Sequence, residues 1–352
     1  MQLSDRKNRG EWSELYALLH LLSTGAIQVT TSGSDSANSL WPVVFISRKI
    51  DGVLHDFRVG EFDIEVLPNS QHAVGTKVSR QLLTSQRDLL LSEIKKGKGR
   101  AFSISESKQI MDSLGLNKAT GTTEKSDLII TIYDPRINSE SEQGFSIKSF
   151  IGGRPTLLNA SGVTNIEYAI QGILTSEEIQ ELNKLGLKEM VITLQKMGHS
   201  LIPTRVDSRF AENLKMIDNQ MDQLVAQIVV ASLQGQGRSM HDIVNRLEIS
   251  NPLNYSTKNC RVRYIHKIKD LLEAVSLGMR PSEPWEGESE AKGGNLIVTS
   301  NGGLLCHHSF DKDSLRNYLF DHTYIDTPSR KRYKFGKITD GLLSLNFQIR
   351  MS

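Results

Sequence analysis

Two short apolar segments near the middle of the chain constrain its fold most strongly. They cover residues 125–132 and 144–149. Each is an apolar run with one or two polar interruptions, which is typical of a β-strand. Because only a loop starting at Asp134-Pro135 separates them, we expect them to form neighbouring strands of one sheet.

Each segment also carries one charged side chain that suggests a chemistry. Asp127 lies near the start of the first segment, and Lys148 follows 21 residues later in the second. With Phe145 and Ile147 on one face of a strand, Ser146 and Lys148 point to the other. A carboxylate that can hold Mg²⁺, beside a lysine that can position a water, is typical of a metal-dependent phosphodiesterase. The simpler interpretations are a turn cap for the aspartate and an edge-strand charge for the lysine.

The pattern resembles the PD-(D/E)XK nuclease superfamily, in which an Asp opens one strand and an acidic-X-Lys triplet lies in the next. Here the triplet reads Ser146-Ile147-Lys148, so its acidic residue is missing. A wider likeness, to the HpaII family of type II restriction endonucleases, is carried by residues 10–14, 145–165 and 318–336. These segments span nearly the whole chain, so the resemblance is at the level of the family.

The resemblance implies an α/β fold with a central mixed β-sheet of PD-(D/E)XK nuclease type, flanked by helices. It also implies a C-terminal mixed α/β region that recognises DNA. The implied activity is Mg²⁺-dependent, sequence-specific cleavage of double-stranded DNA at a short site such as CCGG, leaving 5′-phosphates. A homodimer on a palindromic site and a cognate DNA methyltransferase as a functional partner follow from the same resemblance. Two alternatives stay open: a structure-specific repair or recombination nuclease of this superfamily, and a non-catalytic DNA-binding protein with a decayed site.

The missing acid leaves the second metal ligand open. Glu14 is the first choice beside Asp127, because Gly10-x-x-x-Glu14 resembles the entry to the first helix of the superfamily. Glu11 lies three residues earlier on the same helical face and competes for the role. A glutamate is also favoured at a helix N-terminus by the helix dipole alone. Glu167 is a third candidate, since some superfamily variants with a Ser-X-Lys triplet recruit a helix glutamate downstream of the lysine.

Candidate DNA contacts fall in the block that follows the second strand and in two basic clusters, at 258–269 and 330–337. An arginine after two glycines can clamp a phosphate, and arginines in a basic cluster can contact phosphates or read guanine. For each cluster alone, a solvated basic face is the simpler interpretation. The predicted DNA-binding residues are Arg154, Asn165, Arg261, Arg263, Arg330, Lys331 and Arg332.

A second polar cluster, Cys306-His307-His308 followed by Asn317 and His322, superficially suggests a ββα-metal nuclease. The spacing matches that class poorly, and the zinc ligands often seen with such sites are absent from the sequence. The two adjacent histidines are better interpreted as structural or DNA-facing.

Composition limits the broad class of protein. A net charge of +2 means that any DNA affinity must come from local clusters of positive charge. No apolar run reaches the ~18 residues that a membrane span needs, and the N-terminus lacks a signal-peptide pattern. Two cysteines, Cys260 and Cys306, are too few for a disulfide framework or a cysteine-rich zinc site. We therefore expect a cytoplasmic bacterial protein.

Periodicity and turn residues predict the remaining organisation. Strands are expected within 41–67, and the tail from residue 295 is expected to be mixed α/β. We divide the chain into a nuclease core over 1–235 and a DNA-recognition region over 236–352. The predicted helices are 11–23, 76–96, 104–115, 164–174, a further helix that opens at 175–178, 206–234, 238–248, 258–277 and 312–320.

Overall fold

The computed structural model describes residues 6–30, 39–50, 53–67, 75–116 and 127–352. The chain forms two compact units. Unit 1 comprises Met1–Pro155 and Glu290–Leu315, and unit 2 comprises Thr156–Ser289 and Arg316–Ser352. The predicted division near residue 235 falls inside unit 2, between two of its helices. The functional division that it described stays a prediction.

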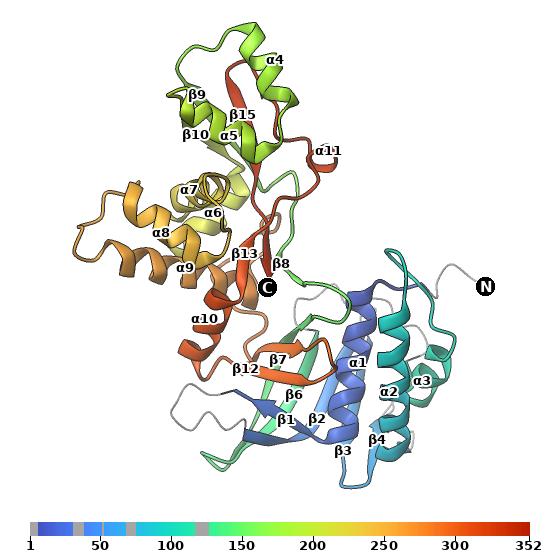
Figure 1. Cartoon of the computed structure of the whole chain (residues 1–352). Helices are drawn as coiled ribbons and strands as arrows, with labels where there is room; N and C mark the ends of the chain where they lie inside the picture. The colour runs from blue at the N-terminus through green and yellow to red at the C-terminus, as the bar shows by residue number, and fades with distance from the viewer. Residues whose placement is uncertain (1–5, 31–38, 51–52, 68–74, 117–126) are drawn as a thin grey trace. The chain divides into compact units, whose positions relative to one another are not determined.

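The described part of unit 1 is built on a nine-stranded mixed sheet in the order β1-β12-β11-β7-β6-β2-β3-β4-β5 (Figure 1). The pairs β1–β12 and β11–β7 are parallel, and the other pairs are antiparallel. The strands are β1 (Ala26–Val29), β2 (Ser39–Ile50), β3 (Val53–Val59), β4 (Asp63–Leu67), β5 (Thr76–Ser79), β6 (Leu128–Asp134), β7 (Ser139–Ser149), β11 (Gly294–Val298) and β12 (Leu304–His308).

The expected mixed sheet is therefore confirmed, but it also closes on itself. β1 pairs with β12 on one edge and with the start of β2 on the other. This second pairing joins β1, β12, β11, β7, β6 and β2 into a closed barrel. The expected sheet flanked by helices did not include this closure. Closure depends on which strands pair in space, and the residue pattern within a single strand does not predict it.

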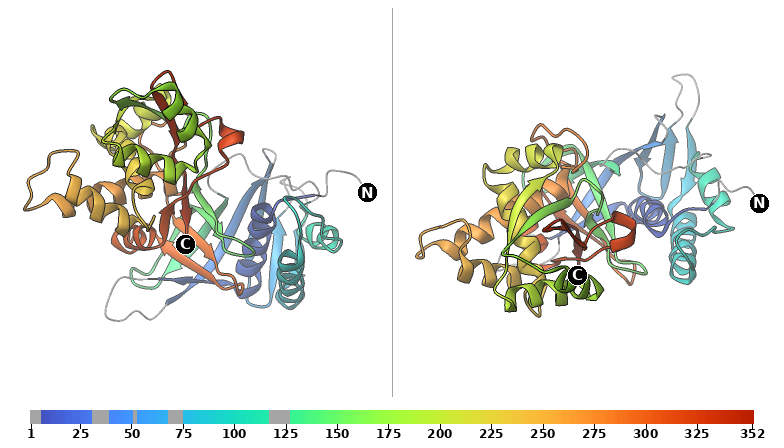
Figure 2. Two further views of the ribbon diagram at one scale, coloured as in Figure 1. Left: turned by 45° about the horizontal axis from the view of Figure 1, so that its top comes forward. Right: turned by 90° about the horizontal axis from the view of Figure 1, so that it is seen from above.

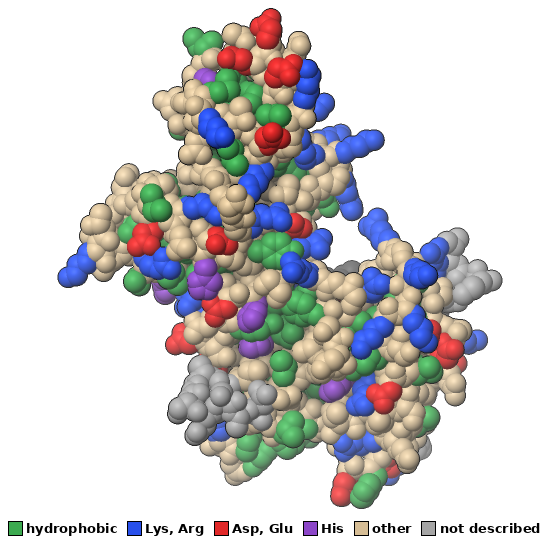
Figure 3. All heavy atoms as spheres, viewed as in Figure 1, with side chains coloured by type: hydrophobic (Ala, Val, Ile, Leu, Met, Phe, Trp, Pro, Cys, Tyr) green, Lys and Arg blue, Asp and Glu red, His purple; other side chains and the backbone are tan. Residues whose placement is uncertain are grey.

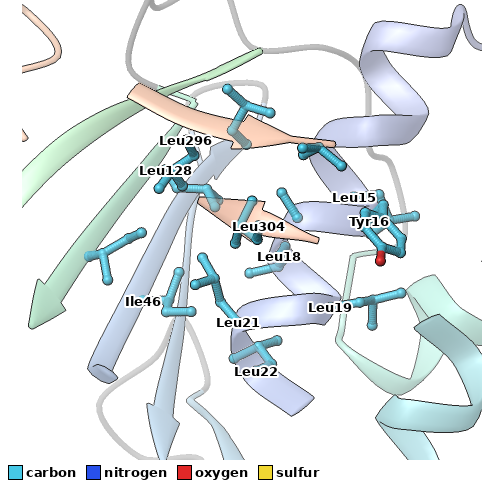
Figure 4. Packing of buried hydrophobic residues seen from close by; sticks show 14 of the residues in the cluster. Leu15, Tyr16, Leu18, Leu19, Leu21, Leu22, Ile46, Leu128, Leu296 and Leu304 are labelled. Carbon is cyan, nitrogen blue, oxygen red and sulfur yellow. The ribbon is translucent and has the colours of Figure 1, made fainter. Parts of the chain in front are cut away.

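Helix α1 (Arg9–Thr24) covers this sheet and fills its core. It begins with a capping box between Asn8 and Glu11 and ends at Gly25, whose φ of 62° is the left-handed conformation that glycine adopts readily. Its leucines pack against strand residues such as Leu128 and Leu296 (Figure 4). Burying each such side chain contributes roughly 1.5–3 kcal/mol. α2 (Arg80–Lys96) lies beside α1 in every view (Figure 2), and α3 (Ser107–Ser113) completes the helices of this part of the chain.

Unit 2 combines two small sheets with a set of helices. One sheet has the order β10-β9-β15-β14 and the other β13-β16-β8, and all of their pairings are antiparallel. The strands are β8 (Thr156–Leu158), β9 (Asn165–Gln171), β10 (Ser200–Val206), β13 (Thr323–Ile325), β14 (Ile338–Thr339), β15 (Leu342–Asn346) and β16 (Ile349–Met351). The helices are α4 (Ser176–Lys184), α5 (Leu187–Lys196), α6 (Ser208–Ile217), α7 (Met221–Leu233), α8 (Met240–Ser250), α9 (Cys260–Leu277) and α11 (Arg330–Tyr333); the division between the units falls within α10 (Lys312–Asp321).

Two helix predictions in unit 2 were wrong. The segment 164–174 contains strand β9, in which Ile166, Tyr168 and Ile170 are buried at a period of two. The predicted long helix over 206–234 is two helices, α6 and α7, interrupted at Asp218. The Asp218 carboxylate accepts a hydrogen bond from the backbone N–H of Gln220 at 2.9 Å, a local bond that competes with the helix.

The other predicted helices are present with adjusted ends. Residues 76–79 form strand β5 and not the start of the predicted helix over 76–96. None of the helices in the described residues is long and apolar enough to cross a membrane.

Candidate active site and nucleic-acid interface

The two apolar segments that constrained the fold are neighbouring antiparallel strands, β6 and β7. Their register pairs Leu128 with Phe145, which brings Asp127 to the second half of β7. The backbone N–H of Asp127 donates to the carbonyl of Phe145 at 2.8 Å, and its Oδ2 accepts from the N–H of Ile147 at 2.5 Å. The carboxylate of Asp127 is therefore held in place by the strand that carries Lys148.

Lys148 lies on the face of β7 that the alternation of this strand predicts. Its Nζ donates to Oγ of Ser146 at 2.9 Å, while Phe145 and Ile147 are buried. β7 is an interior strand of the sheet, and β11 pairs with it directly at Lys148. This position argues against an edge-strand charge. Ser146 serves as the hydrogen-bond acceptor of the lysine.

Glu14, on α1, belongs to the same electrostatic neighbourhood. Its side chain is 19% exposed and its Oε2 accepts from Nη2 of Arg48 at 3.0 Å. Burial, followed by the negative charge of Asp127, raises the pKa of Glu14 to about 7, against the opposing effects of Arg48 and Lys148. Glu14, whose ionisation the neighbouring carboxylate of Asp127 disfavours, forms with Asp127 a pair of oxygen donors that suits a hard divalent cation such as Mg²⁺.

The two competing glutamates have other surroundings. The carboxylate of Glu11 accepts from the backbone N–H of Asn8 at 2.6 Å, so it already completes the capping box of α1. Glu167 belongs to unit 2, on strand β9 and not on the helix that we expected. Its nearest ion-pair partner is Arg205 at 3.9 Å, and both side chains are well exposed. Glu14 is thus the candidate with the clearest relation to Asp127 and Lys148.

Arg48, which lies in β2 and is 3% exposed, is not among the residues predicted from the sequence. Beyond its ion pair with Glu14, its Nε and Nη1 have no hydrogen-bond partner among the described residues. The sequence signal that could have identified Arg48 is a charged residue in the strand 39–50, whose other buried residues are largely apolar. Its charge partner could not be deduced, because Glu14 precedes it by 34 residues in the chain.

Two of the predicted DNA-binding residues form hydrogen bonds within unit 2 that stabilise its fold. Asn165 donates from Nδ2 to the carbonyl of Tyr333 at 2.9 Å and accepts from Nδ2 of Asn346 at 2.8 Å. Arg330 donates to the carbonyl of Leu185 at 3.0 Å and also to that of Gly336. Both side chains are partly buried and fix the start and end of the basic segment. Arg154, in contrast, is exposed in the turn that ends the first stretch of unit 1.

The cations of the basic helix α9 contact side chains within unit 2, and two of them form ion pairs there. Arg261 contacts Glu248 at 2.9 Å, and Lys267 forms an ion pair with Asp218. Lys269 donates to Oδ1 of Asn317 at 2.5 Å. Arg263 is exposed and lies over the ring of Tyr255 at 5.3 Å.

The second basic segment has the opposite character. Its cations Lys331, Arg332, Lys334 and Lys337 are exposed, and none of them forms an ion pair within the described part of the chain. Figure 3 shows Lys and Arg side chains gathered over the region where Figure 1 places α11. Three of these residues, Lys331, Lys334 and Lys337, line a cavity of about 790 Å³ together with Arg330 and Glu167. We call this the basic cavity.

The histidine cluster has a structural environment. Cys306 and His308 are buried in β12, and the ring of His308 lies 5.8 Å from that of Trp41 and 5.6 Å from that of Phe145. Burial, with the nearby charge of Arg136, lowers the pKa of His308 to about 4. A neutral histidine packed among aromatic rings supports the structural interpretation. Asn317 accepts the hydrogen bond from Lys269 that is described above.

Comparison with known proteins places the chain in one family. The sequence model described as HpaII restriction endonuclease matches residues 8–351. The type II restriction enzyme HpaII of Haemophilus parainfluenzae is 34% identical over an alignment of 362 positions, which covers 97% of this chain and 98% of that enzyme. No solved structure matches the chain.

Proposed function

Since the chain belongs to the HpaII restriction endonuclease family, we propose that it is a type II restriction endonuclease that cleaves double-stranded DNA at a short specific sequence. The observation that carries the proposal for the site is the joint placement of Glu14, Asp127 and Lys148 in unit 1. The likeness to HpaII extends along nearly the whole chain, so both the catalytic and the DNA-binding parts have counterparts in that enzyme.

Glu14 and Asp127 are the residues that would hold a divalent cation, and we propose Mg²⁺. When bound, such an ion neutralises charge on the scissile phosphate and activates water. The hydrogen bond from Ile147 N–H to Asp127 fixes one carboxylate, and the ion pair with Arg48 fixes the other. Arg48 also favours the ionised form of Glu14, which is the form that binds metal.

Lys148 acts on the nucleophile. Its side chain, oriented by Ser146, positions the attacking water as the ammonium ion or, as the neutral amine, accepts the proton that the water loses. The water oxygen attacks phosphorus in line with the bond to the 3′-oxygen of the neighbouring nucleotide. That bond breaks and the leaving 3′-oxygen takes up a proton, so the products carry a 5′-phosphate and a 3′-hydroxyl.

Unit 2 supplies much of the DNA contact in this proposal. Lys331 and Arg332 contact phosphates, helped by Lys334 and Lys337, because exposed cations that have no ion-pair partner among the described residues can release counterions from DNA. Arg263 and Arg154 are further exposed candidates. Arg261, Arg330 and Asn165 contribute by holding the surfaces in shape.

We further propose that the enzyme acts as a homodimer on a palindromic sequence, for which CCGG is the first sequence to test. A DNA methyltransferase that modifies the same sequence would be its functional partner. Sedimentation of the protein with and without a duplex carrying the sequence measures the oligomeric state. A monomer on DNA would contradict the symmetric arrangement.

One assay separates this function from its two alternatives. The protein is incubated with a mixed-sequence plasmid and Mg²⁺, and the ends of the products are sequenced. Discrete fragments with one shared end sequence are expected. Nicking limited to branched or damaged DNA would indicate a repair nuclease of the same superfamily. Binding without any cleavage would indicate a protein whose catalytic site has decayed.

A further inference from the structure

The basic cavity of unit 2 contains a carboxylate, which would repel a DNA phosphate bound there. Its lining includes Glu167 and Ser344, which lie directly opposite each other in the β9–β15 pair. Lys331, Lys334 and Lys337 line the same cavity. A surface that bound only the phosphate backbone would be weakened by a negative charge among these lysines.

The position of Glu167 is rigid. β9 is hydrogen-bonded on both sides, to β10 and to β15, and Tyr168 beside it is fully buried with its hydroxyl donating to the carbonyl of Ala226 at 2.8 Å. The side chain alternates away from this core and into the cavity. Side chains on a strand are positioned more accurately than side chains on loops, and recognition of a base requires accurate positioning.

The wall of the cavity is also fixed. Asn165 at one end of β9 holds the carbonyl of Tyr333, and Arg330 bridges the carbonyls of Leu185 and Gly336. The lysines therefore project from a segment whose backbone is fixed against the same sheet that carries Glu167.

Among the described residues, the carboxylate of Glu167 has only a weak ion-pair partner. Its ion pair with Arg205 spans 3.9 Å, with side-chain exposures of 39% and 75%, and such exposed pairs contribute little. The cavity has a second carboxylate, Asp340, but that residue sits in the β14–β15 turn with a φ of 51°. Aspartate is favoured in that conformation by the turn itself, which explains its presence there.

We propose that Glu167 is a specificity-determining residue that accepts a hydrogen bond from the exocyclic amino group of one base of the DNA sequence. Carboxylates accept from cytosine N4, and adenine N6 is the other amino group displayed in the major groove. Lys331, Lys334 and Lys337 contact the phosphates that flank this base. The inference rests on the proposed function, since it assigns a role within sequence-specific DNA binding.

The test uses the full chain and the sequence found by end-sequencing of plasmid fragments. Duplexes carry that sequence with one cytosine at a time replaced by 2-pyrimidinone, or one adenine by unsubstituted purine, each of which lacks the amino group. Equilibrium binding is measured without divalent metal. For the unaltered protein, one replacement is expected to weaken binding by roughly 5- to 150-fold, and whether it is a cytosine or an adenine identifies the base.

The variant Glu167→Ala should bind the normal and the amino-lacking duplex equally at that one position and still discriminate at the others. Asp340→Asn is the matched control: it removes one negative charge from the same cavity but should keep full discrimination. If Glu167→Ala discriminates at every position as the unaltered protein does, the inference is wrong. That result differs from a failure of the proposed function, in which the unaltered protein would produce no discrete plasmid fragments.

Discussion

The charged groups of the candidate active site in unit 1 and those of the basic cavity in unit 2 have opposite environments. Glu14 and Arg48 are 19% and 3% exposed and bind each other, and the pKa of Glu14 is raised by burial. Lys331 and Lys337 are exposed and form no ion pair within the described residues. Burying a charge costs free energy unless the charge is paired and hydrogen-bonded. Exposed cations contribute to DNA affinity mainly through the number of phosphates that they contact. Single substitutions should therefore be decisive in unit 1 and graded in unit 2.

The largest expected effect tests the catalytic half of this comparison. Lys148→Ala and Asp127→Ala should each reduce plasmid cleavage by on the order of 10³-fold or more, because in our proposal each removes a group that acts on the transition state. Binding to the same DNA without divalent metal should be largely retained. Ser146→Ala, which removes only the acceptor of the lysine hydrogen bond, should have a smaller effect. A Lys148→Ala protein that cleaves within about tenfold of the unaltered enzyme would place the catalytic lysine elsewhere.

The second prediction separates the three glutamates. Glu14→Gln should lower cleavage by on the order of 10²-fold and raise the Mg²⁺ concentration needed for half-maximal rate. Glu11→Gln is the matched control one turn earlier, since glutamine can preserve the capping box. Glu167→Ala should leave the Mg²⁺ requirement unchanged, because we assign it to base contact. If Glu167→Ala instead were the variant with the altered Mg²⁺ requirement, the metal-binding glutamate would lie downstream of the lysine.

The third prediction concerns stability and pH in metal-free protein. The pKa of Glu14 is raised from about 4.5 to about 7, so the folded protein keeps a proton that the unfolded chain has lost in this range. Stability contributed at this position should therefore fall as pH rises from about 4.5 to about 7, by up to about 3 kcal/mol. The free energy of unfolding measured at both ends of this range should show that slope in the unaltered protein and a smaller one in Glu14→Gln. Parallel curves would contradict the raised pKa.

The smallest expected effect compares the two basic segments of unit 2. Lys331→Gln with Lys337→Gln should weaken DNA binding by about tenfold at moderate salt and lower the slope of log K against log salt by close to two units. Lys267→Gln with Lys269→Gln removes the same charge from α9, where Asp218 and Asn317 already engage these lysines. This control should leave the slope almost unchanged. A larger change in the α9 pair would move the main DNA contact to that helix.

Arg330 shows why the comparison between exposed and engaged cations cannot be made from the sequence. Arg330 and Lys331 are adjacent in one basic cluster, yet Arg330 binds two backbone carbonyls and Lys331 lines the open cavity. Arg330→Ala should therefore loosen the cavity wall as well as remove a charge. For this reason Lys331 and Lys337 are better tests of DNA contact than Arg330.

The sequence by itself determined the features that rest on short-range pattern. Alternation and apolar runs identified β6 and β7, and strand periodicity put Ser146 and Lys148 on one face. The family-like segments identified the class of enzyme, which the match to HpaII confirms. These features could be predicted because strand pairing across a short loop and side-chain alternation depend on residues close together in the chain.

Only the tertiary structure decided the features that join distant residues. The pairing of β1 with both β12 and β2 closes the sheet, and the contact of Arg48 with Glu14 links a strand to a helix. Segment 164–174 was mistaken for a helix because its polar residues hid an alternation whose apolar face is buried by unit 2. Whether a charge is buried, paired or open to solvent depends on what packs against it, and that is set by the whole fold.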